Sequence, residues 1–307
     1  MNTPMVSSKT RSRFRGFTIL ELMVAMTITA IIVGALVTIT ATAIDTWNNS
    51  RNELRAARQA EAMINVLTKD LESLVVRSDR QQEWLSAILE TPTDGGSTNA
   101  ARLIFFTAAT DRYDGQVGTT DDLGGDISCV AYQLEWKDPV SAGTSTFETF
   151  VLNRHLVNPD LTFQNLLGQT DDLNSLDSVF TTAYGTLIDQ DRNFVCENIF
   201  QFTMVFHVQA LDGSGNLVTQ LVSVSPGVNG KEIFRVQHDA IEALETPSAT
   251  PQADLLNGTL TAVEVSLTVL TDTAIAQLRA NNTLSENADW VAANSYSFTR
   301  LVQVPRK

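Results

Sequence analysis

The longest apolar run in the chain lies close to the N-terminus. No charged residue occurs from Leu22 to Ile44, and Asp45 is the next one. Counted from Phe17, the run covers residues 17–44 and contains one acid, Glu21. As a helix it is about 40 Å long, whereas a bilayer core needs about 20 apolar residues. The pattern therefore predicts a helix long enough to span a membrane.

Beyond Asp45 the composition becomes more polar, but the helical period continues. Apolar residues recur at multiples of three or four positions and predict one face for burial: Trp47, Leu54, Ala57, Ala60, Ile64, Leu67, Leu71 and Leu74. The charged residues lie largely off that stripe: Arg51, Arg55, Arg58, Glu61, Lys69 and Asp70. No proline interrupts the segment. We expect one helix from Phe17 to about Arg77, with its second half packed on a globular domain.

The remainder of the chain is predicted to consist mainly of strands and loops. The predicted strands cover residues 102–107, 127–136, 147–156, 198–209, 217–224, 233–236, 260–270 and 296–304. Several alternate, as where Phe200, Phe202 and Met204 are separated by Gln201 and Thr203. This period of two predicts antiparallel sheet with one buried face. Polar loops are expected at 110–126, 168–193 and 225–258, with a short helix near 239–244 in the last. The predicted fold class is α+β.

Charge and composition exclude several classes of function. The 307 residues contain 21 Lys and Arg against 35 Asp and Glu, which gives a net charge of −14. A nucleic-acid binder needs a basic face, so no nucleic-acid partner is expected. His155, His207 and His238 show no metal spacing. No nucleotide-binding loop or nucleophile motif is found, so neither an enzyme nor a cofactor is predicted.

One acidic loop is a weak candidate for calcium. Five aspartates crowd residues 110–126, namely Asp111, Asp114, Asp121, Asp122 and Asp126. Carboxylate oxygens suit calcium, but an ordinary solvated loop is the alternative interpretation.

The segment before the apolar run is basic. It contains Lys9, Arg11, Arg13 and Arg15 and no acid, which predicts a cytoplasmic N-terminus and an external C-terminal part. Cys129 and Cys196 would then lie where disulfides persist, and they are a candidate pair, with two buried thiols as the alternative. A cleaved secretory signal has a shorter apolar region, of about 7–15 residues. A plain membrane anchor does not explain Glu21, because a carboxylate within an apolar helix is costly.

The junction Gly16-Phe17-Thr18-Ile19-Leu20-Glu21 resembles the processing site of type IV prepilins and type II secretion pseudopilins. The resemblance implies that prepilin peptidase cleaves between Gly16 and Phe17 and that Phe17 is N-methylated. It also implies that Glu21 pairs with the N-terminal amine of a neighbouring subunit during assembly. The alternative interpretation is that Glu21 lies close to the membrane surface and extends its carboxylate to the interface. Helix 17–44 would then pack against the same segment of other pseudopilins or pilins.

The order of the later segments resembles the J-type minor pseudopilin, from the strand at Val130 to the last one, and it includes Leu152-Asn153-Arg154. The sequence patterns and the two resemblances together predict a cleaved leader at 1–16, a transmembrane helix at 17–44, an amphipathic helix at 45–78 and a periplasmic β-rich domain at 79–307. The predicted function is a tip-proximal, inner-membrane pseudopilus subunit of a type II secretion system. A minor type IV pilin of a pilus or DNA-uptake machine, and a membrane-anchored periplasmic binding protein that never polymerises, are the alternatives.

Overall fold

The structure is a computed structural model that describes most of the chain after the leader. It covers residues 17–76, 83–92, 94–97, 99–108, 125–140, 147–167, 175–226, 230–237, 240–246, 249 and 253–305. The chain forms two compact units, Met1–Arg51 and Asn52–Lys307. The first contains the apolar helical segment, and the second contains all the strands.

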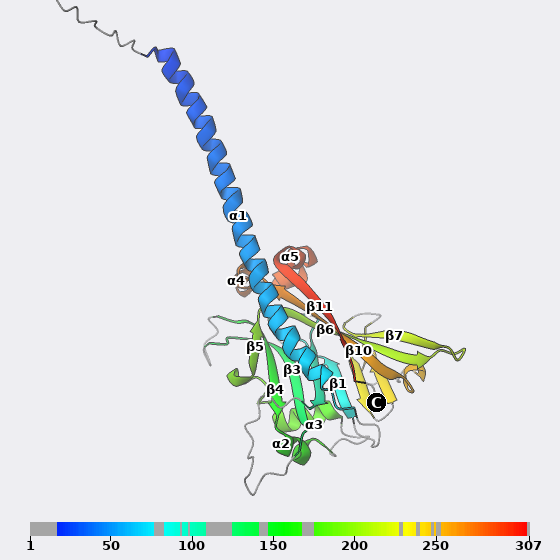
Figure 1. Ribbon diagram of the computed structural model, residues 1–307. Helices are drawn as coiled ribbons and strands as arrows, with labels where there is room; N and C mark the ends of the chain where they lie inside the picture. The colour runs from blue at the N-terminus through cyan, green and yellow to red at the C-terminus, as the bar shows by residue number, and fades with distance from the viewer. Residues whose placement is uncertain are drawn as a thin grey trace, which may run out of the picture. The chain divides into compact units, whose positions relative to one another are not determined.

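Helix α1 extends from Ile19 to Glu72, as its proline-free sequence predicts (Figure 1). It ends earlier than the expected Arg77 because the chain joins a sheet directly after it. Leu74 bridges to Thr107, and the amide of Val75 donates to the carbonyl of Phe106 at 2.9 Å. These bonds replace the helical ones, since a residue cannot supply both ladders.

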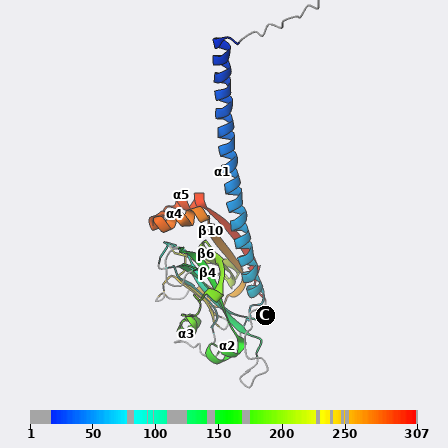
Figure 2. The same cartoon turned by 90° about the vertical axis from the view of Figure 1, so that its left-hand side faces the viewer.

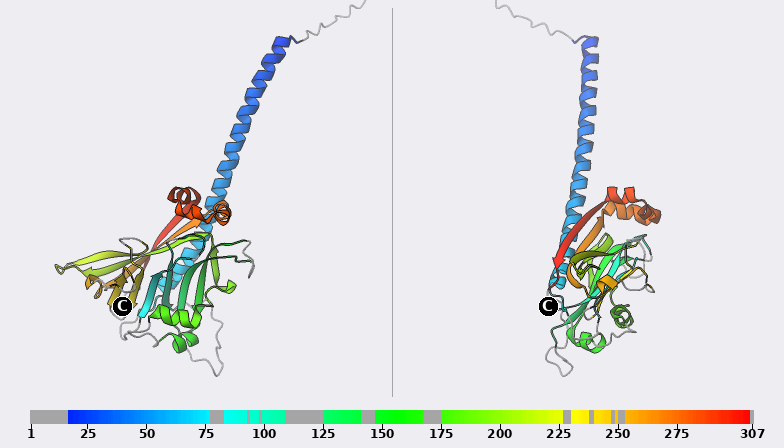
Figure 3. Two further views of the ribbon diagram at one scale, coloured as in Figure 1. Left: turned by 180° about the vertical axis from the view of Figure 1, so that it is seen from behind. Right: turned by 90° about the vertical axis from the view of Figure 1, so that its right-hand side faces the viewer.

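Eleven strands in the described part of the chain form two antiparallel sheets (Figures 1 and 3). The seven-stranded sheet has the order β5-β4-β3-β2-β1-β8-β9 and the four-stranded sheet the order β11-β10-β6-β7. The strands are β1 Glu83–Leu89, β2 Ala101–Thr107, β3 Ser128–Lys137, β4 Thr149–Val157, β5 Phe194–Glu197, β6 Ile199–Leu211, β7 Leu217–Val224, β8 Ile233–Gln237, β9 Ala240–Leu244, β10 Thr259–Leu270 and β11 Ser295–Gln303.

Short helices lie at both ends of the β domain (Figure 2). Helices α4 and α5 follow β10 at one end, whereas α2 and α3 lie at the other. Their bounds are α2 Pro159–Asn165, α3 Leu176–Tyr184, α4 Asp272–Ala280 and α5 Ala288–Asn294, with single 3-10 turns at Asp191–Asn193, Ala253–Leu255 and Asn282–Glu286. Side-chain caps begin several of them, for example at Ser175, whose hydroxyl accepts from the Ser178 amide at 3.2 Å.

The core lies where the two sheets face each other. Phe206 of β6 stacks on Phe234 of β8 with ring centroids 3.9 Å apart, and Tyr132 of β3 meets Phe202 of β6 at 6.4 Å. The second half of α1 adds buried side chains from Ala56 onward. Leu54, expected on the buried stripe, stays 59% exposed because it precedes that point.

The α+β layout and the strands predicted from alternation are confirmed. The predicted strand at 198–209 is β6, and Phe200, Phe202 and Met204 are buried while Gln201 and Thr203 are not. The expected helix near 239–244 is wrong, because Ala240–Leu244 forms β9 and pairs with β8. Tertiary pairing overrides the helix-forming Ala, Glu and Leu of that segment. Strands β1 and β5 and helices α2 to α5 were not anticipated, since they are short or lie within polar stretches.

Candidate functional site

The start of α1 is a capping box built from Thr18 and Glu21. The Thr18 hydroxyl accepts from the Glu21 amide at 3.2 Å, and the Glu21 carboxylate accepts from the Thr18 amide at 3.4 Å. Two amides of the first turn, which have no helical partner, are thereby satisfied. This bond holds the Glu21 carboxylate at the backbone nitrogen of Thr18, the residue that directly follows Phe17. Phe17 itself is 84% exposed, and Gly16 lies outside the described residues.

The apolar segment that follows has no neighbours within its own compact unit. Its large hydrophobic side chains are between 51% and 84% exposed. A helix with this many exposed apolar side chains is unfavourable in water, so lipid or partner helices must cover it. The segment is long and apolar enough to cross a membrane, which is compatible with single-pass anchoring.

Threonines within this segment and directly after it do not oppose burial of the helix. Each of six threonine hydroxyls donates to the carbonyl four residues earlier, at 2.8 to 3.0 Å. Their positions are Thr27, Thr29, Thr38, Thr40, Thr42 and Thr46. Since a hydroxyl paired in this way needs no water, the helix is compatible with a hydrocarbon environment.

A buried ion pair joins the end of α1 to the seven-stranded sheet. Asp70 receives two bonds from Arg154 of β4, from Nε at 2.7 Å and from Nη2 at 2.8 Å. The Tyr132 hydroxyl of β3 also donates to Asp70. Asp70 and Arg154 are 0% and 2% exposed. A buried charge pair requires such complete bonding, because desolvation of an unpaired charge is strongly unfavourable.

Asp70, expected off the buried stripe of the helix, is instead fully buried. Asp70 lies three residues after Leu67 and four before Leu74, which is the buried phase of the helix. The charge of Asp70 at a position that this spacing places on the buried face was the signal in the sequence for a buried ion pair. The partner of Arg154 could not be predicted from the segment Leu152-Asn153-Arg154, because nothing in the sequence joins β4 to the end of α1.

A second buried acid holds α3 against β1. Glu83 is 4% exposed and accepts at 2.8 Å from the amide of Leu176, the first residue of α3. Burial raises the pKa of Glu83 from 4.5 to about 7, an effect that the Leu176 bond and the nearby Arg235 partly oppose. Its other oxygen has no hydrogen-bond partner among the described residues. The arrangement is that of a helix anchor with an acid that titrates near neutrality.

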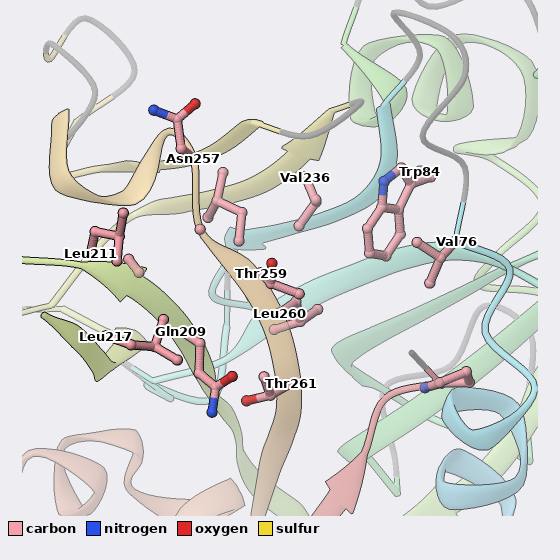
Figure 4. Close-up of a pocket in the computed structure, with 14 residues that line it drawn as sticks. Val76, Trp84, Gln209, Leu211, Leu217, Val236, Asn257, Thr259, Leu260 and Thr261 are labelled. Atoms are coloured by element: carbon pink, nitrogen blue, oxygen red, sulfur yellow. The ribbon is translucent and has the colours of Figure 1, made fainter. Parts of the chain in front are cut away.

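An apolar pocket opens beside the β6–β7 hairpin (Figure 4). Its volume is about 540 Å³, which is in the range of small-molecule sites. Fourteen residues line it, and none is charged: Val76, Trp84, Gln209, Ala210, Leu211, Leu217, Val236, Ile241, Asn257, Gly258, Thr259, Leu260, Thr261 and Pro305. The pocket can therefore hold an uncharged apolar group, with amide and hydroxyl groups available at its wall.

The candidate disulfide is not formed. Cys129 and Cys196 are both buried and free. Cys129 lies on β3 opposite Val157 of β4, whereas Cys196 lies on β5 opposite Leu152 of β4. An intervening strand and an offset of several residues along it separate the two sulfurs, which exceeds the reach of a disulfide. Burial raises the pKa of Cys196 to about 12 and that of Cys129 further, so both are unreactive thiols.

The calcium candidates fall mostly outside the described residues. Of the five, only Asp126 is described, and it is exposed; Asp111, Asp114, Asp121 and Asp122 are not. Within the described part of the chain, no three His, Cys, Asp or Glu side chains come together as a metal site.

The described histidines take part in side-chain contacts. His155 is buried beside Asn193 at 3.0 Å, and His207 lies 3.7 Å from Glu264. His238 lies outside the described residues.

Comparison with known proteins bears on the N-terminal segment. A family model described as the prokaryotic N-terminal methylation motif matches residues 11–37. No curated protein and no solved structure matches the chain significantly. The motif is that of structural subunits that prepilin peptidase processes and that assemble with other pilins. The motif leads into a long apolar helix and an antiparallel β domain, so the chain has the α+β layout of a pilin-like protein.

Proposed function

We propose that the chain is a minor, tip-proximal pseudopilin of a type II secretion system. The observation that carries the proposal is the methylation motif at 11–37, which leads into an apolar helix whose large side chains are more than half exposed. The peptidase would remove residues 1–16 and methylate Phe17, leaving the C-terminal domain in the periplasm. The basic leader supports that orientation in the inner membrane.

Assembly would bury the apolar helix against the same segment of neighbouring subunits. Without a hydrophobic driving force in lipid, this association depends on close packing and on polar pairs. Glu21 supplies one such polar group, because its carboxylate stands at the helix start where a neighbour's methylated amine would arrive. A positive amine and a carboxylate are tolerable in an apolar environment only as a pair. Two compatible roles thus fall to Glu21, the cap of its own helix and the partner of a neighbouring amine.

The size of the outer domain supports a minor subunit rather than the repeated shaft subunit. Two sheets and four short helices follow α1 in the described structure. The resemblance to the J-type subunit includes Arg154, whose ion pair with Asp70 joins helix to sheet. In this proposal, residues 1–16 form the leader and residues 17–44 the membrane segment. Residues 45–78 form the amphipathic helix and residues 79–307 the periplasmic domain.

Intact-mass analysis of the protein purified from its host tests the processing step. The expected product begins at Phe17 and carries one methyl group, and Gly16→Leu should accumulate the membrane-inserted precursor. Gly34→Ala is the matched control, since an added Cβ at Gly34 meets nothing within 4 Å and should leave cleavage unchanged. An unprocessed N-terminus at Met1, or a cut beyond Ala30, would contradict the pilin assignment.

A second substitution separates a fibre subunit from a plain anchored binding protein. Glu21→Val should leave membrane insertion intact and abolish incorporation into fibres, because the neighbouring amine loses its partner. Normal function of the Glu21→Val protein in secretion would favour the anchored protein that never polymerises.

A further inference from the structure

The four-stranded sheet ends on β7, and the hairpin that leads into it projects from the domain (Figures 1 and 3). The amide of Asp212 donates to the carbonyl of Asn216 at 2.8 Å, which fixes the phase of the hairpin. Hydrogen-bonded and open pairs alternate along an antiparallel ladder. Because Asp212 and Asn216 form a hydrogen-bonded pair, every second residue of β7 after Asn216 also bonds β6. The N–H and C=O groups of the residues between them, Leu217, Thr219 and Leu221, therefore point away from β6.

Backbone hydrogen bonds at the far end of β7 independently show the same alternation of inward and outward residues. Lys231 donates its amide to the carbonyl of Ser223 at 2.9 Å, and its own carbonyl accepts from Ser225 at 3.1 Å. Both contacts lie on the side away from β6, at odd-numbered residues. Lys231 therefore covers the end of the edge. Between residues 217 and 221 the outward groups have no backbone partner in the described part of the chain.

This edge lacks the protection that the other edges have. Exposed strand edges are usually short or carry charged residues, which prevents unwanted pairing. Each other edge strand contains a charged residue, with Arg300 in β11, Glu197 in β5 and Glu242 in β9. The eight residues of β7 contain neither a charge nor a proline.

Apolar side chains accompany the free backbone. Leu217 and Leu221 are 66% and 64% exposed, and Leu211, directly opposite Leu217, is 62% exposed. Leu211 and Leu217 also line the uncharged pocket of about 540 Å³ (Figure 4). Edge, leucines and pocket thus form one continuous and mainly apolar surface, which His207, opposite Leu221, and its neighbour Glu264 border. Such a surface suits an extended, uncharged segment with apolar residues at alternate positions.

The source of that segment follows from how the chain is anchored, and here the inference rests on the proposed function. Subunits that pack through their apolar helices hold their outer domains at high effective concentration. A strand from a neighbouring subunit would therefore reach β7 before a free protein does. We propose that the β7 edge at residues 217–221 docks an uncharged strand of a different pilin-like subunit, which adds a fifth strand to the sheet.

Site-specific photo-crosslinking of the full chain in its host tests this docking. Thr219→benzoylphenylalanine places the reactive group on the edge, and Thr299→benzoylphenylalanine is the control on β11, at the opposite edge of the same sheet. The expected result is an adduct from position 219 only, with a protein that carries its own N-terminal methylation motif. An adduct between two copies of this chain, one with a protein lacking the motif, or none would overturn the proposal.

A second pair of variants tests strand pairing itself. Thr219→Pro removes an outward amide at an edge position, where proline is tolerated in sheets, whereas Thr219→Val keeps the amide. With the photoreactive residue at Leu221, the proline variant should lose adduct yield about tenfold, which corresponds to roughly one hydrogen bond, and the valine variant should not. Equal yields from two variants with normal melting curves would exclude a backbone-paired strand.

The same samples separate this inference from the proposed function. Mass analysis of the N-terminus reports processing, independently of any adduct. A chain that begins at methylated Phe17 and gives no adduct overturns only the β7 docking. A chain that is never processed contradicts the pseudopilin assignment, whatever the crosslinking shows.

Discussion

Removal of the charge on Asp70 should destabilise the outer domain more than almost any other single polar substitution. In Asp70→Asn, the Arg154 guanidinium keeps its burial but loses a carboxylate that receives two of its bonds. Breaking one partner of a buried ion pair typically costs about 3–5 kcal/mol, because the other charge is left uncompensated. For a domain of this size, each kcal/mol lowers Tm by about 2–4 °C, so the fall should be on the order of 10 °C.

Thermal unfolding of the processed, detergent-solubilised chain measures this effect. Tryptophan fluorescence is suitable, since Trp84, Trp136 and Trp290 lie in the domain that unfolds. Arg55→Met is the matched control. Arg55 also pairs with acids, Glu197 among them at 3.2 Å, but its side chain is 56% exposed. An exposed pair contributes less than about 1 kcal/mol, so this variant should melt close to the wild type.

The double variant Asp70→Leu with Arg154→Leu provides the decisive comparison. It removes both charges, so it should be less destabilised than the sum of the two single variants. Additive effects, or a loss below about 1 kcal/mol in Asp70→Asn, would show that the pair does not hold α1 to the sheet as described.

Three further predictions concern the β domain. The pKa of Glu83 is raised from 4.5 to about 7 in the folded state, so stability should fall as pH rises between these values. Glu83→Gln should remove that fall and stabilise the protein by about 3 kcal/mol at pH 8 but not at pH 4, and parallel pH profiles of Tm would refute this. Cys129 and Cys196 should resist alkylation in the native protein, and both should label on denaturation without reductant; failure of both to label would indicate a disulfide. Phe206→Ala should cost about 3–5 kcal/mol in chemical denaturation, because it removes the ring that stacks on Phe234, and a loss under about 1 kcal/mol would place the contact between the sheets elsewhere.

Local pattern was sufficient for the parts of the chain that contact no distant segment, or that repeat a simple period. The apolar run from Leu22 to Ile44 determines a helix by composition alone, and the Gly16–Glu21 junction is readable as a motif because its residues are adjacent in sequence. The alternation in β6 likewise determined which residues are buried, since successive side chains of a strand point to opposite faces. The apolar helix, the junction motif and the alternation in β6 each depend on residues that are only a few positions apart in the sequence.

The order of the strands and the partners of buried polar groups were decided only by tertiary structure. Asp70 and Arg154 are 84 residues apart, and their pairing requires the end of α1 to lie over β4. Segment 240–244 has helix-forming residues but becomes a strand because β8 presents a free edge to it. Cys129 and Cys196 could pair by compartment, yet β4 separates them. In each case the free energy comes from desolvation and pairing between distant segments, which no local sequence pattern encodes.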